Sequence, residues 1–174
     1  MTKRPFLPLT LFILTTLACS LFTTREITSK NPWVQNPPQL NGNYSETGQV
    51  VDIIDGDTID VMIDGEEYRV RYIGIDTPER DEVCYNEATA KNSALVANQT
   101  VRLVQDVSDV DRYGRLLRYV YVDNLLVNAE LVAGGWAESK AYRPDTELHN
   151  FMEDLESDAA NAQRGCYPTG IFNK

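Results

Sequence analysis

The stretch TIDVMIDGEEYRVRYIGI, residues 58–75, decides the fold. Its first six residues alternate, with Ile59, Val61 and Ile63 on one face, which is the two-residue period of a half-buried β-strand. Asp64-Gly65 follows as a hairpin turn, and residues 67–75 continue as a second strand. The stretch therefore predicts two antiparallel strands joined by a tight turn.

Further strands are expected around this hairpin. The segments 48–53 and 101–105 have strand composition, and a second hairpin is expected from 116–122 through Asp123-Asn124 to 125–127. Five strands with helices between them predict an α+β domain built on a partly open Greek-key barrel.

Three helices fit the gaps between these strands. Asn86 is expected to cap a helix running to about Ala97, and Asn128 a short helix ending at Gly134-Gly135. The last helix is marked by apolar residues at helical spacing: Leu148, Phe151, Met152, Leu155, Ala159 and Ala162. Its acidic residues, Glu153, Asp154, Glu156 and Asp158, are expected to face water.

Residues 1–18 have the layout of a signal peptide. Two basic residues precede an apolar stretch at 6–14 that is too short to span a bilayer, and small residues follow. Residues 16–19, TLAC, resemble a bacterial lipobox, which predicts lipidation at Cys19 and a cell-surface lipoprotein. The alternative is cleavage after Ala18 and a soluble secreted protein.

Residues 19–47, rich in Asn, Pro, Ser and Thr, are expected to form a flexible tether to one domain at 48–174.

The chain carries a net charge of -10, which becomes -12 once the two basic residues of segment 1–18 are removed. Such a charge should repel nucleic acid at long range. Screening over about 8–10 Å at physiological salt nevertheless lets a local basic cleft act almost independently of distant acids. The residues expected to form this cleft are Arg71, Arg112, Arg115, Arg118, Lys140 and Arg143.

Residue types suited to phosphodiester cleavage occur in three blocks: Asp55-Gly56-Asp57-Thr58, Asp76-Thr77-Pro78-Glu79 and Asp111-Arg112-Tyr113-Gly114-Arg115. This reaction needs a hard cation on one phosphate oxygen, cationic groups on the others, and a base that aims water. Each block alone is compatible with an ordinary turn or cap. Together they indicate a nuclease.

Asp57 and Asp76 are the expected metal ligands. Asp57 stands at the head of one strand and Asp76 closes the next, so their carboxylates are expected to meet and share a cation. Two carboxylates, a backbone carbonyl and water suit Ca²⁺, which takes oxygen ligands in loose geometry. So few charged ligands predict weak binding.

Arginines are expected to hold the phosphate, because a guanidinium stays charged and can grip two oxygens at once. Arg71 and Arg115 are the candidates, although Arg69 lies on the same strand face as Arg71 and one of these two could be a surface residue. Tyr113 and Tyr142 are expected to stack on a base or sugar.

The numbers of histidines and cysteines limit which catalytic schemes and cross-links this chain can form. The single histidine, His149, excludes acid–base schemes that use two histidines. Once Cys19 is set aside, Cys84 and Cys166 remain as an even pair in an exported chain, which favours a disulfide over two free thiols.

From about residue 48 to residue 167 the chain resembles the staphylococcal nuclease (thermonuclease) family. The family's Asp-Gly-Asp-Thr, strand Arg, Asp-Thr-Pro-Glu and Asp-Lys/Arg-Tyr-Gly-Arg motifs occur in order, and VNAELV at 127–132 resembles its next helix. The resemblance implies a five-stranded OB-fold barrel with three helices that binds Ca²⁺ and hydrolyses DNA and RNA to 3′-phosphate ends.

The resemblance also implies a role for each candidate site residue. Asp57, Asp76 and the Thr77 carbonyl would hold Ca²⁺, Arg71 and Arg115 would grip the phosphate, Glu79 would be the general base, and Tyr113 and Tyr142 would contact the nucleotide. Lys140 departs from the family's type member, which has a tyrosine there. We expect a monomer.

Two alternatives to a nuclease remain. One is a non-catalytic OB-type module that binds nucleic acid or another ligand at the cell surface, and the other is a structural lipoprotein domain.

Overall fold

A computed structural model describes residues 38, 40 and 44–172. The expected signal peptide, the lipidation site Cys19 and most of the expected tether lie outside the described residues. The strands are β1 (Ser45–Ile53), β2 (Thr58–Ile63), β3 (Glu66–Tyr72), β4 (Ile75–Asp76), β5 (Thr100–Val104), β6 (Leu116–Val122), β7 (Leu125–Leu126) and β8 (Glu138–Ser139). The helices are α1 (Tyr85–Val96), α2 (Val127–Ala133) and α3 (His149–Asn161), followed by a 3-10 turn at Tyr167–Thr169.

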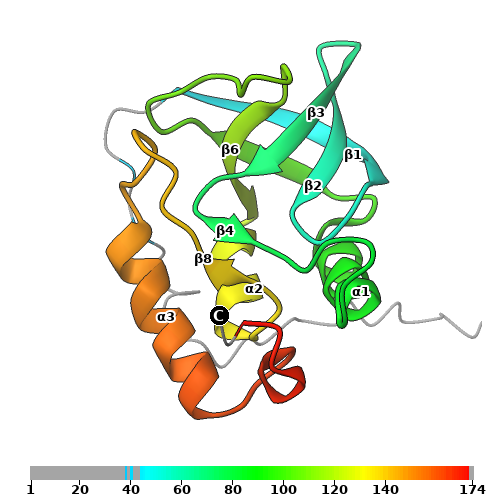
Figure 1. The fold of residues 1–174 in the computed structure, drawn as a ribbon. Helices are drawn as coiled ribbons and strands as arrows, with labels where there is room; N and C mark the ends of the chain where they lie inside the picture. Colours follow the sequence, from blue (N-terminus) through cyan, green and yellow to red (C-terminus); the bar gives the residue numbers. More distant parts are fainter. Residues whose placement is uncertain (1–37, 39, 41–43, 173–174) are drawn as a thin grey trace, which may run out of the picture.

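Strands β1, β2, β3, β5 and β6 form a barrel (Figure 1). The order is β3-β2-β1-β5-β6 with antiparallel neighbours, and a parallel pairing of β3 with β6 closes the ring. The predicted α+β class, with a five-stranded OB-fold barrel and three helices, is confirmed. The expectation of a partly open barrel was wrong at one point, since the β3–β6 pairing joins its two edges.

The β2–β3 hairpin turns at Asp64-Gly65 as expected. Asp64 and Gly65 have φ angles of 50° and 90°, and two successive positive φ angles match the twist of a tight antiparallel hairpin. The second strand is shorter than the predicted 67–75, because β3 ends at Tyr72. Gly74 takes a φ of 78°, which breaks the strand and sends the chain into β4, where Ile75 and Asp76 pair with β8 instead. This break directs Asp76 towards the site described below.

The barrel begins earlier than the predicted boundary at residue 48. Ser45 already pairs with Val104, and Glu46 with Leu103, so the strand includes residues that were expected in the tether. The interior is filled by apolar residues from every barrel strand, among them Val50, Ile59, Val61, Val70, Leu103 and Val120, all buried.

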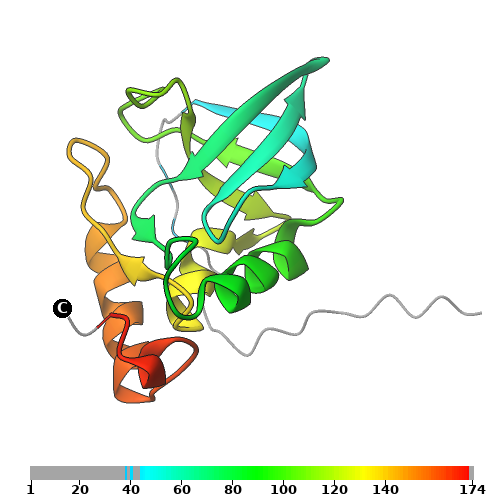
Figure 2. The ribbon, with the colours of Figure 1, turned by 45° about the vertical axis from the view of Figure 1, so that its right-hand side comes forward.

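The helices lie together at one end of the barrel (Figures 1 and 2). Helix α2 packs against both α1 and α3, and α1 also contacts β1. None of the helices in residues 44–172 has the length and apolar character needed to cross a bilayer.

Both predicted asparagine caps were wrong. Helix α1 begins at Tyr85, after Cys84 in a left-handed conformation, and no side chain caps it. Asn128 is buried inside α2, where its Oδ1 accepts from the Val120 amide at 2.9 Å and its Nδ2 donates to the Ile73 carbonyl at 2.9 Å. This amide therefore ties α2 to β6 and to the turn after β3, which is a tertiary role that local sequence does not specify.

Helix α3 buries Met152, Leu155 and Ala159 on one face, as predicted. Ala162 is exposed, because the helix ends at Asn161. Glu156 also departs from the expected solvated face. Its half-buried carboxylate accepts from the Ser139 amide at 3.2 Å and from the Tyr167 hydroxyl at 3.2 Å, so it joins α3 to β8 and to the C-terminal turn.

Cys84 and Cys166 are joined by a disulfide with an S–S distance of 2.03 Å. Both residues are buried, and 82 positions separate them in sequence. The bond links the start of α1 to the segment that follows α3.

Replacing both cysteines with serine should lower the free energy of unfolding by about 4 kcal/mol, since the cross-link restricts a long loop in the unfolded chain. Urea unfolding of the wild type and of Cys84→Ser/Cys166→Ser measures this difference. Peptide mapping of non-reduced, alkylated protein provides the covalent control. Two alkylated cysteines together with equal urea midpoints would contradict the expectation.

Candidate active site

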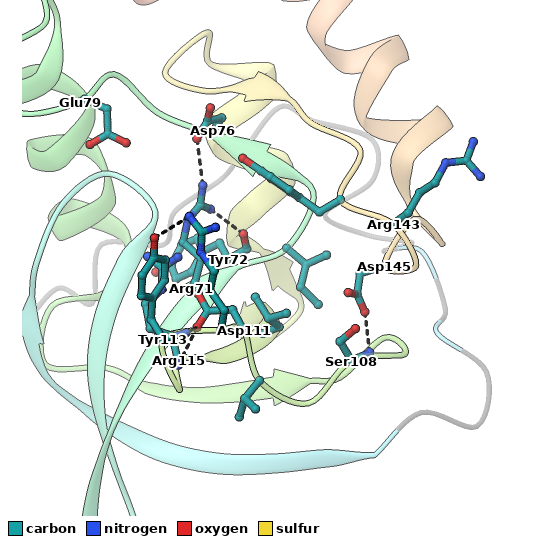
Figure 3. A pocket seen from close by; sticks show the side chains of 15 residues that line it. Arg71, Tyr72, Asp76, Glu79, Ser108, Asp111, Tyr113, Arg115, Arg143 and Asp145 are labelled. Carbon is teal, nitrogen blue, oxygen red and sulfur yellow. Dashed lines mark hydrogen bonds and ion pairs between the residues drawn. The ribbon is translucent and has the colours of Figure 1, made fainter.

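A cavity of about 630 Å³ opens on the side of the barrel, where the end of β3 meets two loops (Figure 3). Six of the predicted site residues line it: Arg71, Asp76, Glu79, Tyr113, Arg115 and Tyr142. Asp57 and Thr77 lie directly behind it; Asp57 contacts both Arg71 and Thr77. The fold therefore brings together all eight residues predicted to bind metal, phosphate or nucleotide.

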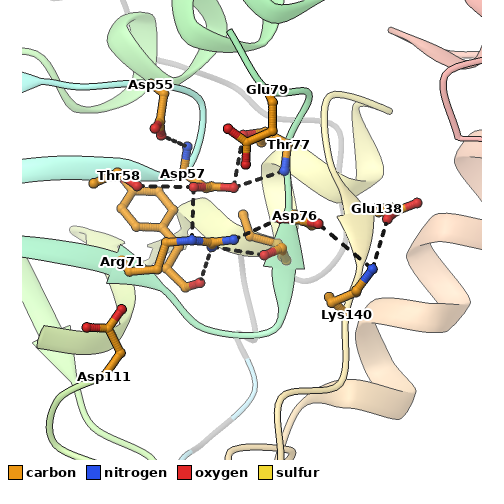
Figure 4. Close-up of polar contacts among 12 residues, drawn as sticks. Asp55, Asp57, Thr58, Arg71, Asp76, Thr77, Glu79, Asp111, Glu138 and Lys140 are labelled. Atoms are coloured by element: carbon orange, nitrogen blue, oxygen red, sulfur yellow. Dashed lines mark hydrogen bonds and ion pairs between the residues drawn. The ribbon is translucent and has the colours of Figure 1, made fainter. Parts of the chain in front are cut away.

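Arg71 contacts two carboxylates and two backbone carbonyls in the site (Figure 4). Its Nε lies 3.2 Å from Oδ1 of Asp57, and its Nη2 donates to Oδ1 of Asp76 at 3.0 Å. Its Nη1 donates to the carbonyls of Tyr72 at 2.7 Å and Ile75 at 2.9 Å. Three guanidinium N–H groups thus donate hydrogen bonds and Nε forms an ion pair, which leaves one Nη2 N–H for a ligand.

Arg69 is the surface member of the arginine pair. Its side chain is 50% exposed and donates to both carboxylate oxygens of Asp60, at 2.8 and 2.9 Å. Arg71 is only 11% exposed, because it stands where β3 enters the closed part of the barrel. The sequence left open which of the two arginines is the surface residue, and the exposed fractions of the two side chains show that it is Arg69.

Asp57 is held by the turn between β1 and β2. Asp55 Oδ1 accepts from the Asp57 amide at 3.0 Å, and Asp57 Oδ2 accepts from the amide and the hydroxyl of Thr77, each at 2.9 Å. Gly56 makes this approach possible, since a Cβ there would lie 2.8 Å from the Thr77 side chain. The turn thus needs glycine for space beside Thr77.

Burial raises the pKa of Asp57 from 3.8 to about 6, even though the neighbouring Arg71 lowers it. The carboxylate of Asp55 adds to the increase. A carboxylate whose charged form is penalised by burial gains from an additional positive charge nearby. Asp57 is therefore suited to hold a cation beyond Arg71.

Asn92 is a supporting residue that the sequence analysis missed. It is fully buried in α1, where its Nδ2 donates to the Asp55 carbonyl at 2.8 Å and its Oδ1 accepts from the Tyr72 hydroxyl at 2.9 Å. These bonds join helix α1 to the Asp55 turn and to the end of β3. An asparagine within a helical pattern carries no local signal for such a role.

Asp111 positions the second arginine. Its Oδ1 accepts from the amides of Tyr113 at 2.8 Å and Arg115 at 3.0 Å, and its Oδ2 accepts from Arg115 Nε at 2.6 Å. The Arg115 side chain is 31% exposed and lines the cavity. An aspartate that opens a short Gly-containing turn could have indicated this role.

Aromatic rings flank both arginines. The Tyr113 ring lies 4.7 Å from the Arg112 guanidinium carbon and 5.6 Å from that of Arg115. Across the cavity, the Tyr142 ring lies 5.8 Å from the Arg71 guanidinium carbon. Burial, followed by the charge of Asp76, raises the pKa of the Tyr142 hydroxyl.

The Tyr142 loop is tied to the opposite wall by Asp145, which the sequence analysis also missed. Asp145 is buried, and its Oδ1 accepts from the amides of Val107 at 3.0 Å and Ser108 at 2.7 Å. The two loops that border the cavity are therefore linked.

Glu79 stands at the rim of the cavity with an exposed side chain (Figure 3). Its amide donates to Glu82 Oε2 at 2.8 Å, which fixes the backbone. Among the described residues, no side chain or amide forms a hydrogen bond or ion pair with its carboxylate. Glu79 can therefore accept a proton or a water hydrogen bond without first breaking an internal contact.

Two members of the expected basic cleft do not line the cavity. Arg118 is 1% exposed and pairs with Glu46 at 2.9 Å and Asp109 at 2.7 Å on another part of the barrel. Lys140 instead lies near the carboxylates of Asp76 and Glu138. Four arginines and four carboxylates line the cavity, so it is nearly neutral on an acidic protein rather than basic.

Comparison of the sequence with known proteins places the chain in a family. The family described as "Staphylococcal nuclease homologue" matches residues 69–167. The chain is 34% identical over 134 residues to a thermonuclease of Staphylococcus hyicus, covering 74% of this chain and 79% of that one. It is 33% identical to a thermonuclease of Staphylococcus intermedius, covering 79% and 83%. It is also 42% identical to Endonuclease YncB of Bacillus subtilis over 63% of this chain and 54% of that protein. The chain belongs to the staphylococcal nuclease family.

Proposed function

We propose that this protein is a Ca²⁺-dependent nuclease that hydrolyses DNA and RNA and leaves 3′-phosphate ends. The observation that supports this most is that Arg71, Asp76, Glu79 and Arg115 line one cavity. Asp57 lies behind them and pairs with Arg71. The nuclease names of the relatives support the reaction class. Export to the cell surface, by a signal peptide at 1–18 and lipidation at Cys19 or by plain secretion, is part of the proposal.

The residues present fit a calcium ion. Asp57, Asp76 and the Thr77 carbonyl would hold it, and such an all-oxygen set suits a hard cation. Among the described residues there is no cluster of three or more His, Cys, Asp or Glu side chains placed to bind a metal. The ion would therefore sit in an open site with water as its remaining ligands, which favours weak binding.

Bound Ca²⁺ would supply a positive charge beside a non-bridging phosphate oxygen. Arg71 and Arg115 face the same space and would stabilise the charge that accumulates on the other oxygens. Glu79 would orient the attacking water and receive its proton at the carboxylate, which lies free at the rim. Tyr113 and Tyr142 would border the nucleotide on either side of the phosphate.

The acidic composition is compatible with this substrate. The cavity itself is nearly neutral, so a divalent cation would make it the positive part of a chain with a net charge of -10. Substrate binding would then depend on the metal as well as on the arginines. Distant acids are screened at physiological salt.

Nuclease activity should require Ca²⁺. Purified full-length protein incubated with single-stranded DNA or RNA should cleave both with calcium and neither with excess chelator, because the cavity alone has little net positive charge. End-labelling of the products tests for 3′-phosphates. Full activity in chelator would refute the metal assignment, whereas binding without cleavage would favour the non-catalytic module.

Arg71→Ala, Glu79→Ala and Arg115→Ala should each lower kcat by at least about 100-fold, the usual loss when one transition-state donor is removed. Arg102→Ala is the matched control, since Arg102 stacks on Tyr121 with its guanidinium carbon 4.0 Å from the ring and does not line the cavity. Circular dichroism checks folding. A near-normal rate in any of the first three variants would remove that residue from the mechanism.

Asp57→Asn should abolish activity and make the stability of the chelator-treated protein less dependent on pH between pH 4 and pH 8. The pKa of Asp57 is about 6 in the folded protein against an ordinary value of 3.8, so its contribution is most favourable below pH 3.8 and is lost as the pH rises through 6. Ionisation of Asp57 in the folded protein should therefore cost the wild type at most about 3 kcal/mol of stability between these two pH values, a pH-dependent loss that the non-titrating Asn does not show. Urea midpoints of both proteins from pH 4 to pH 8 measure this. A variant whose stability falls as steeply as that of the wild type between pH 4 and pH 8 would contradict the expectation.

A further inference from the structure

Asp76 is contacted by two cationic side chains. Arg71 Nη2 donates to its Oδ1 at 3.0 Å, and Lys140 Nζ lies 3.9 Å from its Oδ2 (Figure 4). Lys140 Nζ also lies 3.4 Å from Oε1 of Glu138. Both oxygens of one proposed calcium ligand therefore face a positive charge that belongs to the protein itself.

The fold fixes Lys140 at this place. Strand β8 pairs with β4, so that Glu138 lies opposite Asp76 and Ser139 opposite Ile75. The Lys140 amide then donates to the Gly74 carbonyl at 2.9 Å, which holds its backbone beside the turn before β4. Arg71 is packed among two carboxylates and two carbonyls, whereas the Lys140 side chain is 46% exposed and has water to move into.

A divalent cation on Asp76 would repel the Lys140 ammonium. The two charges would be only a few ångströms apart, and Lys140 would have to give up Asp76 and turn towards solvent or Glu138. Once the lysine has turned away to roughly 6–12 Å from the ion, the repulsion between the +1 and +2 charges at the dielectric of water still changes the affinity for the ion by about three- to tenfold. Lys140 thus weakens the binding of a cation that the site otherwise favours.

We propose that Lys140 is a tethered competitor of Ca²⁺ for Asp76, and that it sets the calcium concentration at which the nuclease becomes active. This inference rests on the proposed function. An affinity lowered in this way suits an exported protein, because extracellular calcium sites work at dissociation constants of about 10⁻⁴–10⁻³ M. At the far lower free calcium inside a cell the lysine would keep its place on Asp76.

Calorimetric titration of the full chain with CaCl₂, without nucleotide, tests the proposal. Lys140→Met should lower the Kd for Ca²⁺ about three- to tenfold. Lys140→Arg, which keeps the charge, should not tighten binding. Lys91→Met is the matched control, because it removes the same charge from an ion pair of equal length, 3.9 Å to Glu130, on a surface away from the cavity.

The half-maximal calcium concentration for DNA cleavage should fall in Lys140→Met in parallel with its Kd. If Lys140→Met binds Ca²⁺ no more tightly than wild type, or if Lys91→Met tightens binding equally, the competition is refuted while the nuclease assignment stands. Absence of calcium binding in the wild type would overturn the inference together with the metal in the proposed function. Tighter binding in Lys140→Met with no cleavage by any variant would support the competition and reject the nuclease.

Discussion

The ion-pair arrangement of Asp57, Arg71 and Asp76 is the constraint on which the site depends. A guanidinium that is 11% exposed is stable only if its N–H groups are paired, and Arg71 pairs them with two carboxylates and two carbonyls. Those partners come from the β1–β2 turn, the end of β3 and strand β4. A single buried charge therefore fixes the relative positions of three segments, and each of them carries a residue of the proposed site.

The same arrangement creates a conflict between stability and function. Asp57 and Asp76 neutralise Arg71 in the free protein, yet they are also the carboxylates that would hold a metal. Burial already raises the pKa of Asp57, so the folded protein tolerates its charge at a cost. Buried carboxylates whose ionisation lowers stability are expected at sites where function requires the charge. The supporting bonds from Thr77 and Asn92 keep Asp57 and its turn in place.

Charge is distributed so that the cavity differs from the rest of the surface. The chain is strongly acidic, but four arginines balance four carboxylates around the cavity. Arg118, which the sequence suggested as part of this surface, is instead neutralised by Glu46 and Asp109 elsewhere. An anionic substrate in the cavity would therefore interact mainly with the few charged groups that line it, because at such short distances salt screens little.

The local features of this protein follow from the sequence alone. The alternation in β2, the Asp64-Gly65 turn and the apolar stripe of α3 depend on neighbours within a few residues, so they could be predicted from spacing alone. The three motif blocks likewise showed which residue types the site contains. Which of these residues are buried, and which partners they contact, depends on the tertiary structure. The β3–β6 pairing buried Arg71 and left Arg69 at the surface, the packing of α2 made Asn128 a buried link instead of a cap, and the β4–β8 pairing put Lys140 beside Asp76. These outcomes arise from contacts between segments far apart in the chain, because burial and charge pairing depend on which distant groups the closed barrel brings together.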